Sequence, residues 1–140
     1  MIYLDTSVLG AIFFREANAS LVLSQVEAAR PRGFVISAWT LTEMASVGAI
    51  KERTGTIDRA TRQQALSAFQ GFVSSSLGLT EIEPVDFRSA ALLIDAPGGL
   101  RAGDALHLAV ARRLAADLAT LDRRLADAAP VWGVPLLPVG

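Results

Sequence analysis

Four acidic residues stand where strands are expected to end or helices to begin. Asp5 and Asp122 each follow a short apolar segment. Glu43 lies one turn into an expected helix, and Asp104 lies in the first turn of another. Carboxylates that converge in a cleft repel one another, and a cation relieves this repulsion. Because the sequence has no cysteine and one histidine, carboxylate oxygens would be the main ligands, and these favour Mg²⁺ or Mn²⁺.

Such ions orient a phosphodiester, acidify a bound water and stabilise the leaving oxygen. The predicted reaction is therefore attack of metal-bound water on a phosphodiester. Asp5, Asp104 and Asp122 are the predicted metal ligands, and Glu43 completes the predicted catalytic set. Arg101, just ahead of Asp104, is a candidate phosphate contact because of its position near the expected crevice.

Each acid also has an ordinary structural explanation. Asp5 and Asp122 could cap the helices that follow them, and Glu43 and Asp104 could complement a helix dipole. For each acid alone these explanations are favoured, so the hypothesis depends on the set of four. His107, one turn after Asp104, is interpreted as a half-buried packing residue.

The elements that would position these acids alternate between strand and helix. Strands are expected at Ile2–Asp5, Phe34–Ser37, Leu79–Glu83, Leu118–Leu121 and Val134–Val139. Helices are expected at Ser7–Phe14, Ala17–Arg30, Trp39–Arg53 and Arg59–Ser76, from Pro84 to Pro97, and at Gly103–Ala116 and Arg123–Ala129. This alternation predicts one α/β domain over residues 1–140, with a central parallel sheet of four to five strands flanked by helices. In such sheets, ligands bind beyond the carboxyl ends of the strands.

The composition is that of one folded domain, with 140 residues of which 51% are hydrophobic and 19% charged. The net charge of −1 provides no general attraction for nucleic acid. No membrane-spanning segment is expected, and the absence of cysteine is consistent with a cytoplasmic protein. Trp39 and Trp132 are interpreted as core or interface residues rather than platforms for base stacking.

Four motifs occur in order along the chain: YLDTSVLG (3–10), TLTEMASV (40–47), RAGDALHLAVA (101–111) and LATLDRRLADA (118–128). Together they resemble the PIN-domain ribonucleases over nearly the whole chain. The length of the chain resembles that of the toxin in VapBC-type toxin–antitoxin pairs.

The resemblance implies a ribonuclease that requires Mg²⁺ or Mn²⁺ and forms a homodimer. It also implies an antitoxin partner that covers a hydrophobic groove near the N-terminal helices and inserts a cation among the acids. The four acids match the family's four metal-binding positions in order, and Thr6 or Ser7 matches the supporting hydroxyl. In one departure, Leu125 stands where many members carry Phe.

Two other interpretations remain open. A receiver-type or other phosphoryl-transfer α/β domain also has acids at strand ends, but it needs a lysine late in the sheet. The only lysine here, Lys51, lies in an expected helix, and no Gly-rich phosphate loop is present. The second alternative is a non-catalytic PIN-like scaffold that binds nucleic acid or a protein partner.

Overall fold

The computed structural model describes residues 1–140 and is built around one four-stranded parallel sheet with the strand order β3-β2-β1-β4. The strands are β1 (Ile2–Leu4), β2 (Phe34–Ser37), β3 (Leu77–Thr80) and β4 (Asp117–Ala119). The helices are α1 (Thr6–Phe13), α2 (Ala19–Ala28), the 3₁₀ turn η1 (Arg30–Arg32), α3 (Ala38–Arg53), α4 (Arg59–Ser76), α5 (Pro84–Asp95), α6 (Ala102–Arg113) and α7 (Arg123–Val131). The prediction of one α/β domain with a parallel sheet is confirmed.

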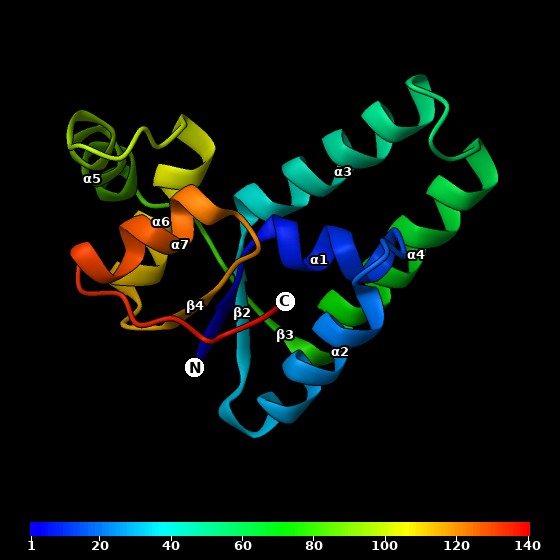
Figure 1. The fold of residues 1–140 in the computed structure, drawn as a ribbon, viewed down its shortest axis with the longest axis horizontal. Helices are drawn as coiled ribbons and strands as arrows, with labels where there is room; N and C mark the ends of the chain where they lie inside the picture. The colour runs from blue at the N-terminus through cyan, green and yellow to red at the C-terminus, as the bar shows by residue number, and fades with distance from the viewer.

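The sheet separates two hydrophobic cores, because successive side chains of a strand point to opposite faces. In β1, Ile2 and Leu4 are buried in the core beneath helices α1 to α4, whereas Tyr3 is buried in the core beneath α5, α6 and α7. Figure 1 shows the two groups of helices on either side of the sheet. The central strands β1 and β2 are buried on both faces, which explains why they are mostly apolar, whereas the edge strand β3 is partly exposed.

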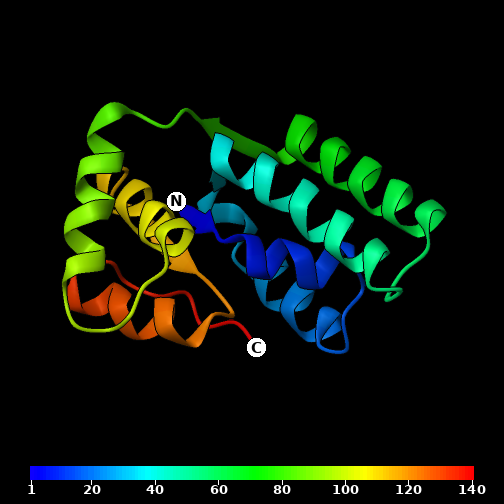
Figure 2. The same ribbon diagram turned by 90° about the horizontal axis from the view of Figure 1, so that it is seen from above.

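Helix α5 is held against α6 by an ion pair at a buried position. Asp86 is almost fully buried, and it accepts hydrogen bonds from the Nε and Nη2 atoms of Arg113 at 2.8 and 2.9 Å. Asp86 also closes a capping box with Glu83 at the start of α5, where Pro84 occupies the first turn. This clamp fixes the position of α5 beside the carboxyl edge of the sheet, which Figure 2 shows from above.

Two predicted strands differ in the structure. The third strand begins at Leu77 rather than at residue 79, because α4 ends at Ser76 and the chain pairs at once with β2. The last predicted strand makes only an isolated bridge between Leu118 and Leu136. Pro135 and Pro138 flank the bridge and have no N–H to donate, so a regular ladder cannot extend along this segment.

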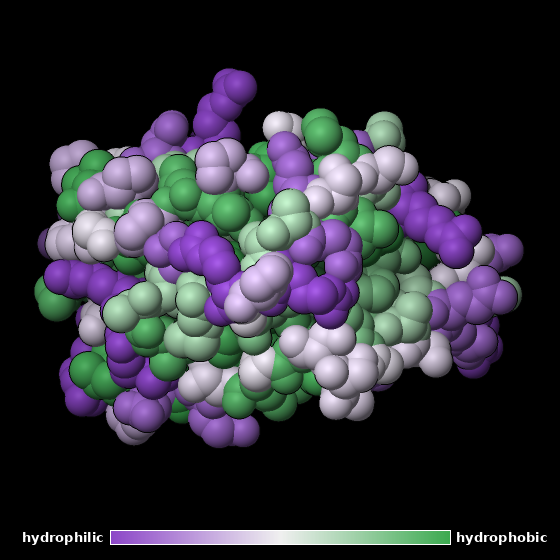
Figure 3. Space-filling view, turned by 90° about the horizontal axis from the view of Figure 1, so that it is seen from below, coloured by the Kyte–Doolittle hydropathy of each residue, from purple (hydrophilic) through white to green (hydrophobic).

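Figure 3 shows the face of the molecule at the end of the sheet where the strands begin. Hydrophilic and hydrophobic residues are interspersed on it. Arg32, just before β2, forms an ion pair there with Asp117 at the start of β4. None of the helices combines the length and the apolarity that are needed to cross a membrane.

Candidate active site

The four predicted acids line one cavity at the carboxyl edge of the sheet. Its volume is about 390 Å³, and Asp5, Glu43, Asp104 and Asp122 all contribute to its wall. The tertiary structure thus brings together acids from four separate segments of the chain. A fifth acid, Glu16, also lines the cavity and forms a salt bridge of 3.2 Å with Lys51.

Asp5 is nearly buried and is held by two hydroxyl groups. Its Oδ2 atom accepts hydrogen bonds from Ser7 Oγ at 2.6 Å and from Thr120 Oγ1 at 2.8 Å. Each hydroxyl in turn accepts a backbone N–H from the loop after β4: Ser7 Oγ from Leu121 at 2.9 Å and Thr120 Oγ1 from Asp122 at 3.0 Å. This hydroxyl bridge joins the carboxyl ends of the neighbouring strands β1 and β4, and it fixes the orientation of the Asp5 carboxylate.

Glu43 reaches the cavity from the second turn of α3, where Thr6 and His107 hold it. Thr6 Oγ1 donates to Glu43 Oε1 at 2.7 Å, and His107 Nε2 forms a hydrogen bond to the same oxygen. The Nδ1 atom of His107 lies 2.7 Å from the hydroxyl of Tyr3, and Nε2 lies 3.5 Å from Asp5 Oδ1. His107 is therefore part of the site, and its interpretation as a half-buried packing residue is wrong.

The pKa values of Glu43 and His107 indicate a charged pair. Burial alone would raise the pKa of Glu43, but the hydrogen bond and positive charge of His107 bring it below its ordinary value. Burial would lower the pKa of His107, but the hydrogen bond to Glu43 and the charge of Asp5 raise it. These shifts favour a protonated His107 beside an ionised Glu43.

The surroundings of Asp104 disfavour its ionised form. Burial raises its pKa from 3.8 to about 6, and the negative charges of Asp122 and Asp5 add to this effect. Asp122 itself caps α7 by accepting a hydrogen bond from the N–H of Leu125 at 2.9 Å. The capping explanation for Asp5 and Asp122 therefore holds, and both acids line the cavity as well.

Gly103 allows α6 to approach α3 closely at this point. A Cβ atom on Gly103 would lie 3.0 Å from Glu43 Oε2 and 3.3 Å from Trp39 Nε1, which is tighter than ordinary van der Waals contact. A side chain at this position would therefore displace Glu43. Arg101, the predicted phosphate contact, is exposed at the N-cap position of α6 and lies outside the lining of the acidic cavity.

Tyr3, Thr120 and Glu16 were not predicted from the sequence as residues of the site. Thr120 stands two residues before Asp122, and this spacing was a signal that its hydroxyl could face the same edge. Tyr3 lies between two apolar residues of a buried strand, so only its hydroxyl hinted at a polar partner. Glu16 follows a helix and carries no comparable signal.

The donor set fits a hard divalent cation in its chemistry. The cavity presents carboxylate oxygens, and burial together with the charges of Asp122 and Asp5 raises the pKa of Asp104, so a cation would stabilise its ionised form. In this conformation no three acidic or histidine side chains converge closely enough to share one ion. Mg²⁺ commonly binds through one or two carboxylates and retains several waters, so it does not require three protein ligands.

The sequence profile of the PIN domain matches residues 2–130. The chain belongs to the PIN domain family. No curated protein matches it in sequence.

Solved structures show the same PIN fold at low sequence identity. VapC20 of Mycobacterium tuberculosis, a toxin that cleaves the sarcin–ricin loop, is 19% identical, with a TM-score of 0.71 over 91% of this chain and 95% of that one. VapBC2 of Rickettsia felis, bound to a DNA fragment from their promoter, is 16% identical, with a TM-score of 0.74 and full coverage of both chains. FitAcB of Neisseria gonorrhoeae is 17% identical, with a TM-score of 0.71 over 99% of this chain and 97% of that one.

Proposed function

We propose that this PIN domain is a metal-dependent endoribonuclease and the toxin of a type II toxin–antitoxin pair. The observation that carries the proposal is the convergence of Asp5, Glu43, Asp104 and Asp122 on one cavity at the carboxyl edge of the sheet. Membership of the PIN family and the likeness in fold to the VapC20 toxin support it. RNA is the proposed substrate, and Mg²⁺ or Mn²⁺ is the proposed cofactor.

The surroundings of each residue indicate its role in the proposed reaction. Asp5 is fixed by Ser7 and Thr120, so its carboxylate is held in one orientation as the proposed central metal ligand. Asp104, whose pKa burial raises to about 6, is the second proposed ligand, and a bound cation would favour its ionised form. Asp122 is the third proposed ligand.

Glu43 is the fourth proposed catalytic carboxylate, and its role differs because His107 is its ion-pair partner and Thr6 donates a hydrogen bond to it. We infer that it orients a water at the edge of the cavity. When bound, a divalent cation would neutralise the phosphate and lower the pKa of a coordinated water. Thr6 and Ser7 act as supporting hydroxyls, because each donates to a carboxylate of the site.

The proposal is tested with purified protein and a mixed RNA pool, incubated with Mg²⁺, with Mn²⁺ or with a chelator. The wild type is compared with Asp104→Asn, and Asp127→Asn serves as a matched control because Asp127 is exposed on α7 outside the cavity. We expect discrete, metal-dependent fragments from the wild type and the control but not from Asp104→Asn. Equal cleavage by Asp104→Asn would refute the assignment of the site.

Calorimetric titration with Mn²⁺ separates the enzyme from the non-catalytic scaffold. Metal binding that Asp104→Asn weakens, together with RNA cleavage, supports the nuclease. The absence of both metal binding and cleavage in the wild type would favour a PIN-like scaffold that binds nucleic acid or a partner.

The proposed antitoxin would use an apolar groove near the N-terminal helices. A groove of about 410 Å³ lies between α1 and α4, where Ile12, Phe13 and Phe14 face Ala65 and Ala68. Co-purification with a small protein encoded beside the chain, and loss of RNA cleavage in that complex, would support this role. The homodimer and the cytoplasmic location both stay predictions; sedimentation of the purified chain tests the first.

A further inference from the structure

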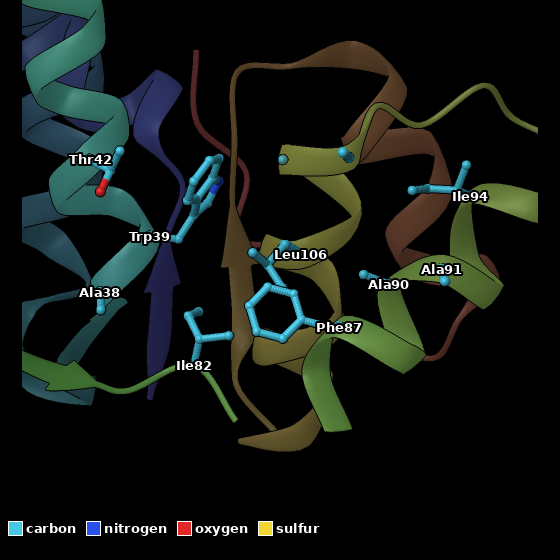
Figure 4. A pocket seen from close by; sticks show the side chains of 11 residues that line it. Ala38, Trp39, Thr42, Ile82, Phe87, Ala90, Ala91, Ile94 and Leu106 are labelled. Carbon is cyan, nitrogen blue, oxygen red and sulfur yellow. The ribbon is translucent and has the colours of Figure 1, made fainter. Parts of the chain in front are cut away.

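A second cavity lies between α3, α5 and the start of α6. Its volume is about 510 Å³, within the range of roughly 300–1,000 Å³ that small-molecule sites occupy. Trp39 of α3 and Phe87 of α5 point into the space between the helices, with Leu106 and Ile82 beside them (Figure 4). None of the side chains that line this aromatic cleft is charged.

The aromatic cleft shares a wall with the acidic cavity. Thr42 lines the cleft and its neighbour Glu43 lines the acidic cavity, and Gly103 and Asp104 are divided in the same way. At this wall, the indole Nε1 of Trp39 lies 3.3 Å from the position that a Cβ atom on Gly103 would occupy. The indole N–H of Trp39 is buried and has no hydrogen-bond partner. It lies near Glu43 and helps to lower the pKa of that carboxyl. The two cavities are therefore adjacent, separated only by consecutive residues of α3 and of α6.

The two cavities differ in the chemistry that they accept. The acidic cavity suits a cation and the phosphate that it would neutralise, whereas the cleft suits a flat, neutral group that stacks through its faces. A nucleotide within a single strand has these two parts side by side. Proteins that bind single strands place unstacked bases against aromatic side chains in this way.

We propose that the aromatic cleft is a subsite for one unpaired nucleobase next to the phosphodiester that is cut. This inference rests on the proposed function. It revises the interpretation of Trp39 as only a core or interface residue. It also gives Phe87, which is 59% exposed in the free chain, a flat group to stack against.

The fluorescence of Trp39 reports whether a base binds in the aromatic cleft. The chain has two tryptophans, so Trp132→Phe leaves Trp39 as the only one, and Asp104→Asn keeps the oligonucleotides intact. The probes are pentamers of uridylate, pentamers of adenylate, and an abasic ribose-phosphate pentamer with the same number of phosphates. Dissociation constants and the quenching of Trp39 fluorescence are measured for each pentamer in the double variant.

We expect the base-containing pentamers to quench Trp39 and the abasic pentamer to bind about 10-fold more weakly without quenching, as expected for the loss of one stacked base. Phe87→Ala should weaken the base-containing pentamers by about 10-fold and leave the abasic pentamer unchanged. Leu92→Ala is the matched control, because Leu92 is on the same helix and 70% exposed but lies outside the cleft. It should change neither affinity.

Equal affinity for abasic and base-containing pentamers would overturn the proposal. So would a Phe87→Ala variant that keeps the preference for bases but shifts to a smaller species in sedimentation, because the cleft would then belong to a protein interface. RNA cleavage by the chain without base-dependent binding would refute the subsite alone. Base-dependent binding without cleavage by the chain would support the subsite and refute the nuclease.

Discussion

Replacing Asp104 with Asn should stabilise the metal-free protein at neutral pH. The pKa of Asp104 is raised from 3.8 to about 6, mainly by burial and then by Asp122 and Asp5. Each pKa unit corresponds to about 1.4 kcal/mol, so ionising Asp104 in the folded chain costs at most about 3 kcal/mol. Because the side chain is partly exposed, solvent screening reduces this cost, and we expect a gain of about 1–2 kcal/mol for Asp104→Asn at pH 7.

The pH dependence follows from the direction of the pKa change. Between about pH 4 and pH 6, the folded chain holds a proton on Asp104 that the unfolded chain has lost, so stability falls as the pH rises. The gain from Asp104→Asn should therefore be near zero at pH 4 and complete above pH 6. Urea denaturation in a chelator at pH 4, 5 and 7 measures this gain.

Addition of Mg²⁺ should reverse the order of stability. A ligand that binds only the folded state stabilises it, and the wild type should gain more than Asp104→Asn because it keeps the proposed ligand. Asp127→Asn, in which an exposed acid outside the cavity is changed, should match the wild type under all conditions. Equal or lower stability of Asp104→Asn at pH 7 in the chelator would refute the picture of a strained acidic cluster.

Three further substitutions examine the supports of the site. Gly103→Ala should reduce RNA cleavage at least about 10-fold, because the added methyl group displaces the carboxylate of Glu43. The free energy of unfolding in urea should fall by less than about 1 kcal/mol, because the displaced atom is at the end of a flexible side chain. His107→Leu should lower the free energy of unfolding by about 1–3 kcal/mol, since it leaves Glu43 without its charged partner; unchanged stability would contradict the pairing. Arg113→Met leaves Asp86 buried and unpaired, so thermal denaturation should show a loss of about 3 kcal/mol. Mn²⁺ affinity should not change in Arg113→Met, because Asp86 lies outside the acidic cavity.

Local patterns in the sequence were sufficient to predict the order of the elements. The apolar segments at residues 2–4 and 34–37 predicted buried strands, and they form the centre of the sheet. Asp5 and Asp122 were predicted at strand ends, and the structure places both directly after strands or their connecting turns. The prediction of a strand at Val134–Val139 was wrong, because Pro135 and Pro138 have no N–H to donate and only an isolated bridge forms between Leu118 and Leu136.

The sequence by itself determined the α/β class, the parallel sheet and the edge at which the acids gather, because hydrophobic periodicity and helix caps are local properties. Only the tertiary structure decided which group meets which acid. His107 meets Glu43 across 64 positions of the chain, and Thr120 meets Asp5 across 115. It also placed an aromatic cleft against the acidic cavity through the close approach at Gly103. These contacts depend on strand register and helix packing, which bring distant residues to within a few ångströms of one another.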